Sequence, residues 1–216
     1  MTTKTTILFD LDNTLIDRIY AAKKAYRMLA EKTYPDNKDK QEELFECMYS
    51  KDDNGDVNKL KQFQEIRDLF VLPQNWVYDC ADFWYEEYPK QAKAFPKSQE
   101  TLTELRKRYR LGLVSNGSEK AQGTKMRQVG LEDYLDMILY SGELGIDKPD
   151  PRVFLEGCKR IGCKPEEAYY IGDNPWRDIA GAWKAGITPI YIWRDDTKPC
   201  PGVRQIHQIE DLLKFL

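Results

Sequence analysis

Histidine is almost absent from this sequence. The single histidine, His207, lies near the C-terminal end of a chain of 216 residues. Histidine triads, sites with several histidine ligands and most serine–histidine hydrolase schemes are therefore disfavoured. We expect His207 to be a surface residue and carboxylate side chains to perform most of any acid–base chemistry.

Paired cysteines are also lacking. The chain has 5 cysteines, an odd number, and they form no CxxC pair and no zinc-like spacing with the histidine. A structural zinc site is therefore not indicated, and we expect reduced thiols.

The sequence has neither a basic surplus nor a long apolar run. It contains 33 Lys and Arg against 36 Asp and Glu, with a formal net charge of -3 and a pI near 5.4. This balance gives no electrostatic reason to expect nucleic-acid or anionic-membrane binding. No run approaches the roughly 20 apolar residues of a membrane helix, and residues 1–6 lack a signal-peptide pattern. We expect a cytoplasmic protein without nucleic-acid or membrane partners; the sequence carries no signal for an oligomeric state.

The composition that is present is that of a folded domain, with 41% hydrophobic and 32% charged residues. Short β-rich apolar runs alternate with helical patterns, which favours a doubly wound, Rossmann-like α/β fold with a parallel sheet. The expected strands cover residues 5–9, 111–115, 137–140, 168–171 and 188–193, and the expected helices cover residues 98–109, 119–129, 152–161, 176–185 and 209–215.

The gap between the first two expected strands is much longer than a crossover helix requires. Residues 17–95 contain four helix-like stretches separated by turn-forming residues. We therefore expect an all-helical cap domain at 17–95, inserted into a core domain made of residues 1–16 and 96–216.

Polar residues follow several of the expected strands directly. In open α/β sheets, ligands bind at the carboxyl ends of the strands, so these residues should converge. Each one alone is usually a turn or cap residue, but as an ordered set they suit a divalent cation that holds a phosphate. The set comprises Asp10, Asp12, Ser115, Asn116, Lys148, Asp173 and Asp178.

The same residues resemble the motifs of the haloacid dehalogenase superfamily of hydrolases. Residues 10–15 (DLDNTL) look like its first motif, Ser115-Asn116 like its second, residues 148–151 (KPDP) like its third, and residues 172–178 like its fourth. The helical insertion between the first two motifs is similar to the phosphoglycolate-phosphatase-like branch. The resemblance spans the expected core domain.

The resemblance implies distinct roles for the carboxylates. Asp10 would attack phosphorus and form an aspartyl-phosphate, and Asp12 would protonate the leaving oxygen and then activate water. The implied metal ligands are Asp10, Asp12 and Asp173, with the backbone carbonyl of Asp12 facing the cation. Asp178 would position the metal's waters or the lysine.

The remaining motif residues would bind phosphate. Ser115 and the amide of Asn116 are implied to hold the transferred phosphoryl oxygens, and Lys148 to neutralise the charge of nucleophile and phosphate. The cofactor would be Mg²⁺, and the substrate a small phosphorylated metabolite that the sequence does not identify.

The residue type at position 12 separates some of the alternatives. A dehalogenase acting at carbon needs no acid there, so Asp12 favours phosphate esters. A phosphoryl-transferring mutase on the same scaffold stays open as the runner-up. A non-catalytic binding module is less favoured, because it would not need nucleophile, acid, lysine and metal ligand together.

Overall fold

The computed structural model describes residues 3–193 and 200–216. It divides into two compact units, Met1–Asp17 with Ala94–Leu216, and Arg18–Lys93. Their boundaries lie within two residues of those expected at 16/17 and 95/96. Residues 94 and 95 belong to the first unit because Ala94 forms a β-bridge with Ile16, and the Phe95 amide donates to the Leu15 carbonyl at 3.0 Å.

The first unit is built on a six-stranded parallel sheet in the order β3-β2-β1-β4-β5-β6. This order is that of a doubly wound, Rossmann-like fold, which confirms the predicted fold class. The strands are β1 (Thr6–Phe9), β2 (Arg110–Ser115), β3 (Met137–Tyr140), β4 (Ala168–Gly172), β5 (Thr188–Ile192) and β6 (Arg204–Ile206).

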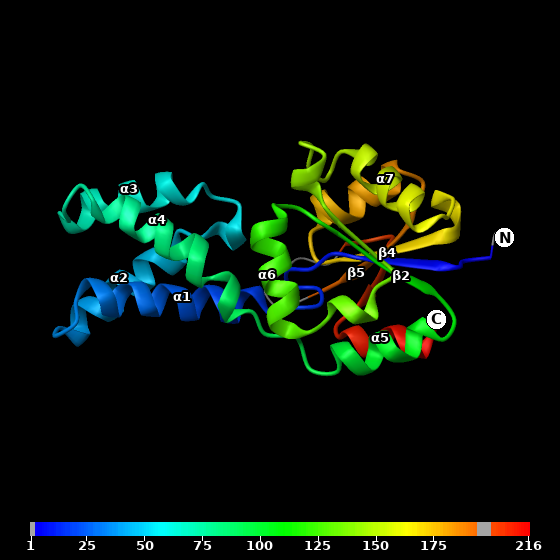
Figure 1. The fold of residues 1–216 in the computed structure, drawn as a ribbon, viewed down its shortest axis with the longest axis horizontal. Helices are drawn as coiled ribbons and strands as arrows, with labels where there is room; N and C mark the ends of the chain where they lie inside the picture. The colour runs from blue at the N-terminus through cyan, green and yellow to red at the C-terminus, as the bar shows by residue number, and fades with distance from the viewer. Residues whose placement is uncertain (1–2, 194–199) are drawn as a thin grey trace. The chain divides into compact units, whose positions relative to one another are not determined.

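Helices cover both faces of this sheet. Helices α5 (Ser98–Arg106) and α7 (Pro151–Ile161) both pack on β2 and lie on opposite faces (Figure 1). All four residues of β1 are buried, as expected of a central parallel strand. Helix α6 (Glu119–Val129) follows β2, and α8 (Gly181–Lys184) precedes β5. Short helical turns lie at Asp53–Gly55, Pro89–Gln91, Glu132–Tyr134, Ser141–Glu143, Pro165–Glu167 and Ile209–Lys214.

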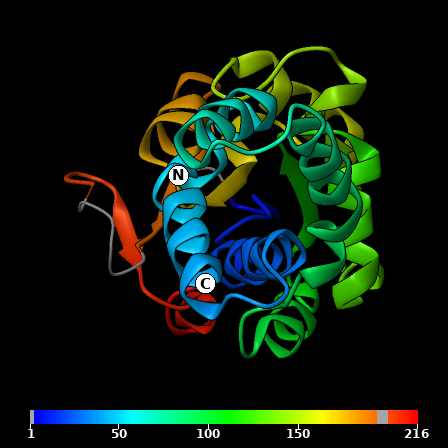
Figure 2. The same cartoon turned by 90° about the vertical axis from the view of Figure 1, so that its left-hand side faces the viewer.

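Two elements of the core differ from expectation. Strand β6 was not predicted, because its three residues, Arg-Gln-Ile, form no apolar run. It pairs with β5 at the edge of the sheet (Figure 2). The helix expected over 176–185 starts instead as a wide π-type turn at Pro175–Ala180. The Asn174 side chain accepts hydrogen bonds from the backbone amides of Trp176 and Arg177 at the start of this turn.

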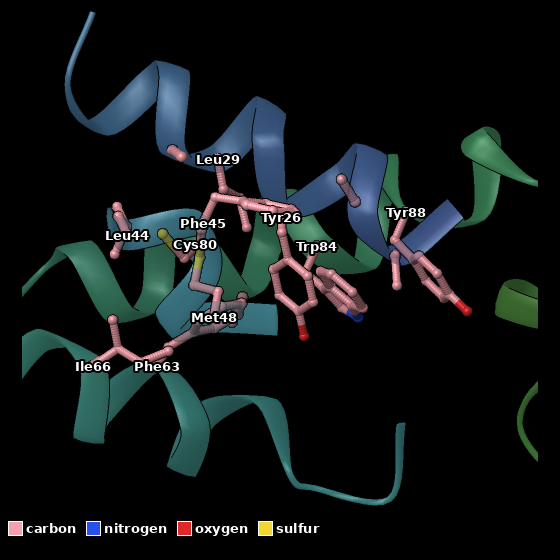
Figure 3. Packing of buried hydrophobic residues seen from close by; sticks show 14 of the residues in the cluster. Tyr26, Leu29, Leu44, Phe45, Met48, Phe63, Ile66, Cys80, Trp84 and Tyr88 are labelled. Atoms are coloured by element: carbon pink, nitrogen blue, oxygen red, sulfur yellow. The ribbon is translucent and has the colours of Figure 1, made fainter. Parts of the chain in front are cut away.

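The second unit consists of helices: α1 (Arg18–Thr33), α2 (Lys38–Ser50), α3 (Lys59–Phe70) and α4 (Trp76–Glu87). Its core is rich in aromatic side chains (Figure 3). Tyr26 stacks on Trp84 with ring centroids 4.4 Å apart, and Trp84 stacks on Tyr88 at 4.5 Å. Within the described part of the chain, no helix is both long and apolar enough to span a bilayer.

Candidate active site

The candidate site lies where the strand order reverses. Strand β1 pairs with β2 on one side and with β4 on the other. Asp10 follows β1 directly, and Asp173 follows β4 directly, so both carboxylates project from the carboxyl edge of neighbouring strands. Open α/β sheets bind their ligands at this switch point.

Lys148 joins two of the carboxylates in a buried ion cluster. Its Nζ lies 2.5 Å from Asp10 Oδ1 and 2.8 Å from Asp178 Oδ1, and it also donates to the Tyr170 hydroxyl at 2.8 Å. Burial by itself lowers the pKa of Lys148, but the charges of Asp10 and Asp178 outweigh it and raise the pKa. Lys148 therefore remains a permanent positive charge beside Asp10.

Gly172 allows Asp178 to reach this cluster. A Cβ atom at Gly172 would lie 2.4 Å from the Asp178 Cβ, closer than real side chains approach. The Asp178 side chain also accepts a hydrogen bond from the Asn174 amide at 3.0 Å, which ties it to the turn after β4. The glycine before the aspartate of the fourth motif is thus required by packing.

Asp10, Asp173 and Asp178 form a buried group whose oxygen atoms lie within 4.8 Å of one another. Burial raises the pKa of Asp10 to about 6, although Lys148 opposes this shift. Burial and the charges of Asp178 and Asp10 also raise the pKa of Asp173 well above its usual value, although a hydrogen bond from Asn13 favours its charged form. Without further positive charge, the three carboxylates are therefore difficult to keep ionised together.

The charges and donor atoms fit a divalent cation. Counted with Asp12, the four carboxylates carry two more formal charges than the ammonium groups of Lys148 and Lys125 that contact three of them in the described part of the chain. Carboxylate oxygens are the ligands that Mg²⁺ prefers, and no thiol or imidazole is among them. The residues present are thus compatible with Mg²⁺.

Asp12 lies in the same loop as Asp10 but in a different environment. Its side chain is 23% exposed, and it pairs with Lys125 Nζ at 2.7 and 2.9 Å. Its Oδ2 also accepts a hydrogen bond from Gln122 Nε2 at 3.0 Å. The carboxylate group of Asp10, Asp173 and Asp178 does not include the side chain of Asp12.

The second motif contacts the first and third. The Ser115 hydroxyl is buried and accepts a hydrogen bond from Gln122 Nε2 at 3.0 Å. Asn116 binds the backbone of Lys148 twice, accepting from its amide at 2.8 Å and donating to its carbonyl at 3.1 Å. The Asn116 side chain therefore fixes the loop that carries the lysine, which the sequence did not indicate.

Three further residues of the site were not predicted: Gln122, Lys125 and Tyr170. The Tyr170 hydroxyl lies in the ion cluster and donates to the Val114 carbonyl at 2.9 Å, but in the sequence it is one residue of an apolar strand. For Gln122 and Lys125 the sequence did carry a signal. They are polar residues at buried positions of α6, where the inward face of a helix would ordinarily be apolar.

Relatives of known name include hydrolases of two kinds. The chain is 31% identical over 196 residues to glyceraldehyde 3-phosphate phosphatase of Methanothermobacter thermautotrophicus, covering 86% of this chain and 84% of the relative. It is also 31% identical over 132 residues to (S)-2-haloacid dehalogenase 4A of Burkholderia cepacia, covering 59% of this chain and 57% of that enzyme.

The chain also matches a solved structure and a model of a protein family. The Bacillus subtilis HAD-hydrolase YfnB, solved bound to magnesium, matches with a TM-score of 0.83 at 21% identity, covering 99% of this chain and 98% of that one. The model of the haloacid dehalogenase-like hydrolases matches residues 7–192, which include every motif residue described above. The chain therefore belongs to the haloacid dehalogenase-like hydrolase family.

Proposed function

We propose that this protein is a Mg²⁺-dependent phosphatase that hydrolyses a small phosphorylated metabolite through an aspartyl-phosphate on Asp10. The observation that carries the proposal is the contrast between the two aspartates of the first motif. Asp10 is buried beside Lys148, whereas Asp12 is partly exposed and paired with Lys125. Two carboxyl groups in such different surroundings suit two different roles, a nucleophile and an acid–base residue.

In the first step, an Asp10 carboxylate oxygen attacks phosphorus, and the bond from phosphorus to the leaving oxygen breaks. Asp12 gives its proton to that oxygen, so that an alcohol departs. Lys148 offsets the charge that accumulates on nucleophile and phosphoryl group, and the Ser115 hydroxyl binds a phosphoryl oxygen. A bound Mg²⁺, held by Asp10, Asp173 and the Asp12 carbonyl, would supply the remaining charge neutralisation.

In the second step, the Asp12 carboxylate takes a proton from water, and the water oxygen attacks phosphorus. The bond between phosphorus and Asp10 breaks, which restores the free carboxylate and releases inorganic phosphate. Asp12 ends with the proton that the next catalytic cycle requires. Atoms and charges therefore balance over one turnover as ester plus water giving alcohol plus phosphate.

The presence of Asp12 also favours phosphatase over dehalogenase activity, since attack at carbon needs no acid for a departing halide. The glyceraldehyde 3-phosphate phosphatase, which is similar over most of both chains, agrees with a small phosphate ester as substrate. A mutase would share the first step but transfer the phosphoryl group to the hydroxyl of a second substrate. Release of inorganic phosphate in the absence of an added hydroxyl acceptor would distinguish a phosphatase from a mutase.

We further propose that the insertion 17–95 acts as a cap that supplies contacts to the leaving group. It is inserted directly after the first-motif loop in the chain, and it has a hydrophobic core of its own. The core domain would then supply the reaction and the cap the substrate preference.

Metal dependence tests the proposal directly. With p-nitrophenyl phosphate, we expect Mg²⁺-supported release of nitrophenolate that EDTA abolishes and added Mg²⁺ restores, while Ca²⁺ supports it poorly because its coordination shell is larger and looser. The same protein should release no chloride from 2-chloropropionate. Full activity in EDTA, or chloride release, would contradict the proposal.

A further inference from the structure

Helix α6 contributes a buried polar pair that the mechanism above does not use. Gln122 is 5% exposed, and the Lys125 side chain is also 5% exposed. The two residues are three positions apart, a spacing that places side chains on the same face of a helix. Both side chains reach Asp12, which is more than 100 residues away in the sequence.

Lys125 contacts both oxygens of the Asp12 carboxylate. Its Nζ lies 2.9 Å from Oδ1 and 2.7 Å from Oδ2. The ammonium group therefore anchors the end of the Asp12 side chain through both oxygens, and the Gln122 contact, made to Oδ2, distinguishes one oxygen from the other. The residual 23% exposure of the Asp12 side chain leaves part of it accessible.

Gln122 connects Asp12 to the second motif. Its Nε2 donates toward Asp12 Oδ2 at 3.0 Å, Ser115 Oγ at 3.0 Å and the Asn116 carbonyl at 2.8 Å. An amide nitrogen has two hydrogens, so at least one is shared between acceptors. One amide group thus sets the distance between the acid–base carboxyl group and the hydroxyl expected to bind phosphate.

We propose that Gln122 and Lys125 are positioning residues that hold the Asp12 carboxyl group in line with the leaving oxygen. This inference rests on the proposed role of Asp12. Proton transfer requires Asp12 to lie within hydrogen-bond reach of the leaving oxygen, and small displacements of a catalytic group are costly. A merely structural pair would attach α6 to the first-motif loop without affecting the step at which Asp12 acts.

The leaving group distinguishes these two roles. Nitrophenolate departs with little protonation, whereas the phenolate of phenyl phosphate is a far stronger base and depends on the acid. For Lys125→Met, which preserves chain length without the charge, we expect kcat for p-nitrophenyl phosphate to fall ~10–100-fold, and KM to fall with it because the second step then limits turnover. The loss in kcat/KM, which reports the step in which the leaving group departs, should be larger for phenyl phosphate than for p-nitrophenyl phosphate.

Rapid-quench labelling adds a readout besides turnover. With p-nitrophenyl phosphate, Lys125→Met should still phosphorylate Asp10, and the aspartyl-phosphate should accumulate because water activation by Asp12 is impaired. Lys125→Arg, which can still contact both oxygens, should restore part of kcat. Gln122→Met should give the same pattern as Lys125→Met in a milder form, and supplies the test if Lys125→Met does not fold.

Lys120→Met is the matched control, because Lys120 is an exposed lysine of the same helix. It should retain wild-type rates with both esters. Equal losses of kcat/KM on both esters, a rise in KM alone, or failure to label Asp10 in a folded variant would overturn the inference. Two outcomes separate the inference from the proposed function. The inference alone fails if wild-type protein is labelled at Asp10 and Asp12→Asn accumulates the label, while Lys125→Met and Gln122→Met behave as wild type. The proposed function itself fails if wild-type protein is never labelled at Asp10.

Discussion

At the scale of single residues, the surroundings decide what each carboxylate can do. Asp10 and Asp12 are separated by one residue, yet one side chain contacts Lys148 and the other Lys125. Strand β1 ends at Phe9, and the loop that follows directs the two side chains toward different partners. Identical residue types two positions apart therefore acquire different surroundings.

Substitution of either aspartate should give a different kind of loss. Asp10→Asn removes the proposed nucleophile while preserving its shape, so both labelling and turnover should disappear. Asp12→Asn should show a burst of about one nitrophenolate per site and then a steady rate reduced ~10²–10⁴-fold. Stopped-flow absorbance and intact mass measure the burst and the label. Near-normal activity of Asp10→Asn would contradict the mechanism.

A methyl group at Gly172 should disrupt the site indirectly, by displacing the Asp178 side chain. In Gly172→Ala, the new Cβ would overlap the Asp178 side chain, which must move away from Lys148. We expect kcat to fall ~10²-fold, since small displacements of a site are costly. Gly123→Ala is a suitable control, because the three atoms nearest to its Cβ would all belong to the far end of the Arg127 side chain. Equal activities of the two variants would contradict the role of Gly172.

At the scale of elements, a buried ion cluster connects the helices of the second unit. Asp52 lies 2.7 Å from Arg18 at the start of α1 and 2.5 Å from Lys59 at the start of α3, and Tyr26 donates to it at 2.6 Å. Burial alone would raise the pKa of Asp52, but the hydrogen bonds and charges of Arg18 and Lys59 outweigh it and lower the pKa to about 2.

The lowered pKa predicts how the stability of this unit depends on pH. A carboxyl group with a depressed pKa in the folded state stabilises above its unfolded pKa of ~3.9, and this contribution is lost as pH falls toward 2. Asp52→Asn should be less stable by about 3–5 kcal/mol at neutral pH, because it leaves two buried cations without their partner. Thermal unfolding from pH 6 to pH 3 should show a steeper decline for wild type than for Asp52→Asn. Parallel declines would contradict the assignment to Asp52.

At the scale of the whole molecule, the chain enters and leaves the second unit through neighbouring segments. Ile16 and Ala94 form an antiparallel bridge, and Phe95 donates to Leu15. The two ends of the insertion are thus joined within the first unit, which has its own sheet and core.

Removal of the insertion should therefore leave a folded protein. When residues 18–93 are replaced by a short Gly-Ser linker between Asp17 and Ala94, we expect circular dichroism of a folded α/β domain and slow hydrolysis of p-nitrophenyl phosphate. Discrimination among larger phosphate esters should be lost. Exposed apolar surface can cause aggregation, so the measurement uses soluble monomer isolated by gel filtration. An unfolded soluble core would contradict the independence of the two units.

The sequence by itself determined the fold class and the set of motif residues. Apolar runs of strand length alternating with helical periods predict a parallel sheet, and all parallel strands end at the same edge. Residues that directly follow strands in the chain, such as Asp10 and Asp173, must therefore lie at that edge, and the pairing of β1 with β4 brings these two together. The family resemblance, confirmed over residues 7–192, rests on the same spacing.

Tertiary structure alone decided which neighbours these residues acquire. Lys125 meets Asp12 across 113 positions of sequence, and Lys148 meets Asp10 across 138. The second pair could be expected from the sequence because both residues match motifs of a known family, whereas the first pair could not. The Tyr170 hydroxyl reaches the ion cluster from an apolar strand, and β6 forms because β5 offers an unpaired edge. Such contacts depend on the packing of elements distant in the chain, whereas secondary structure follows from residues adjacent in it.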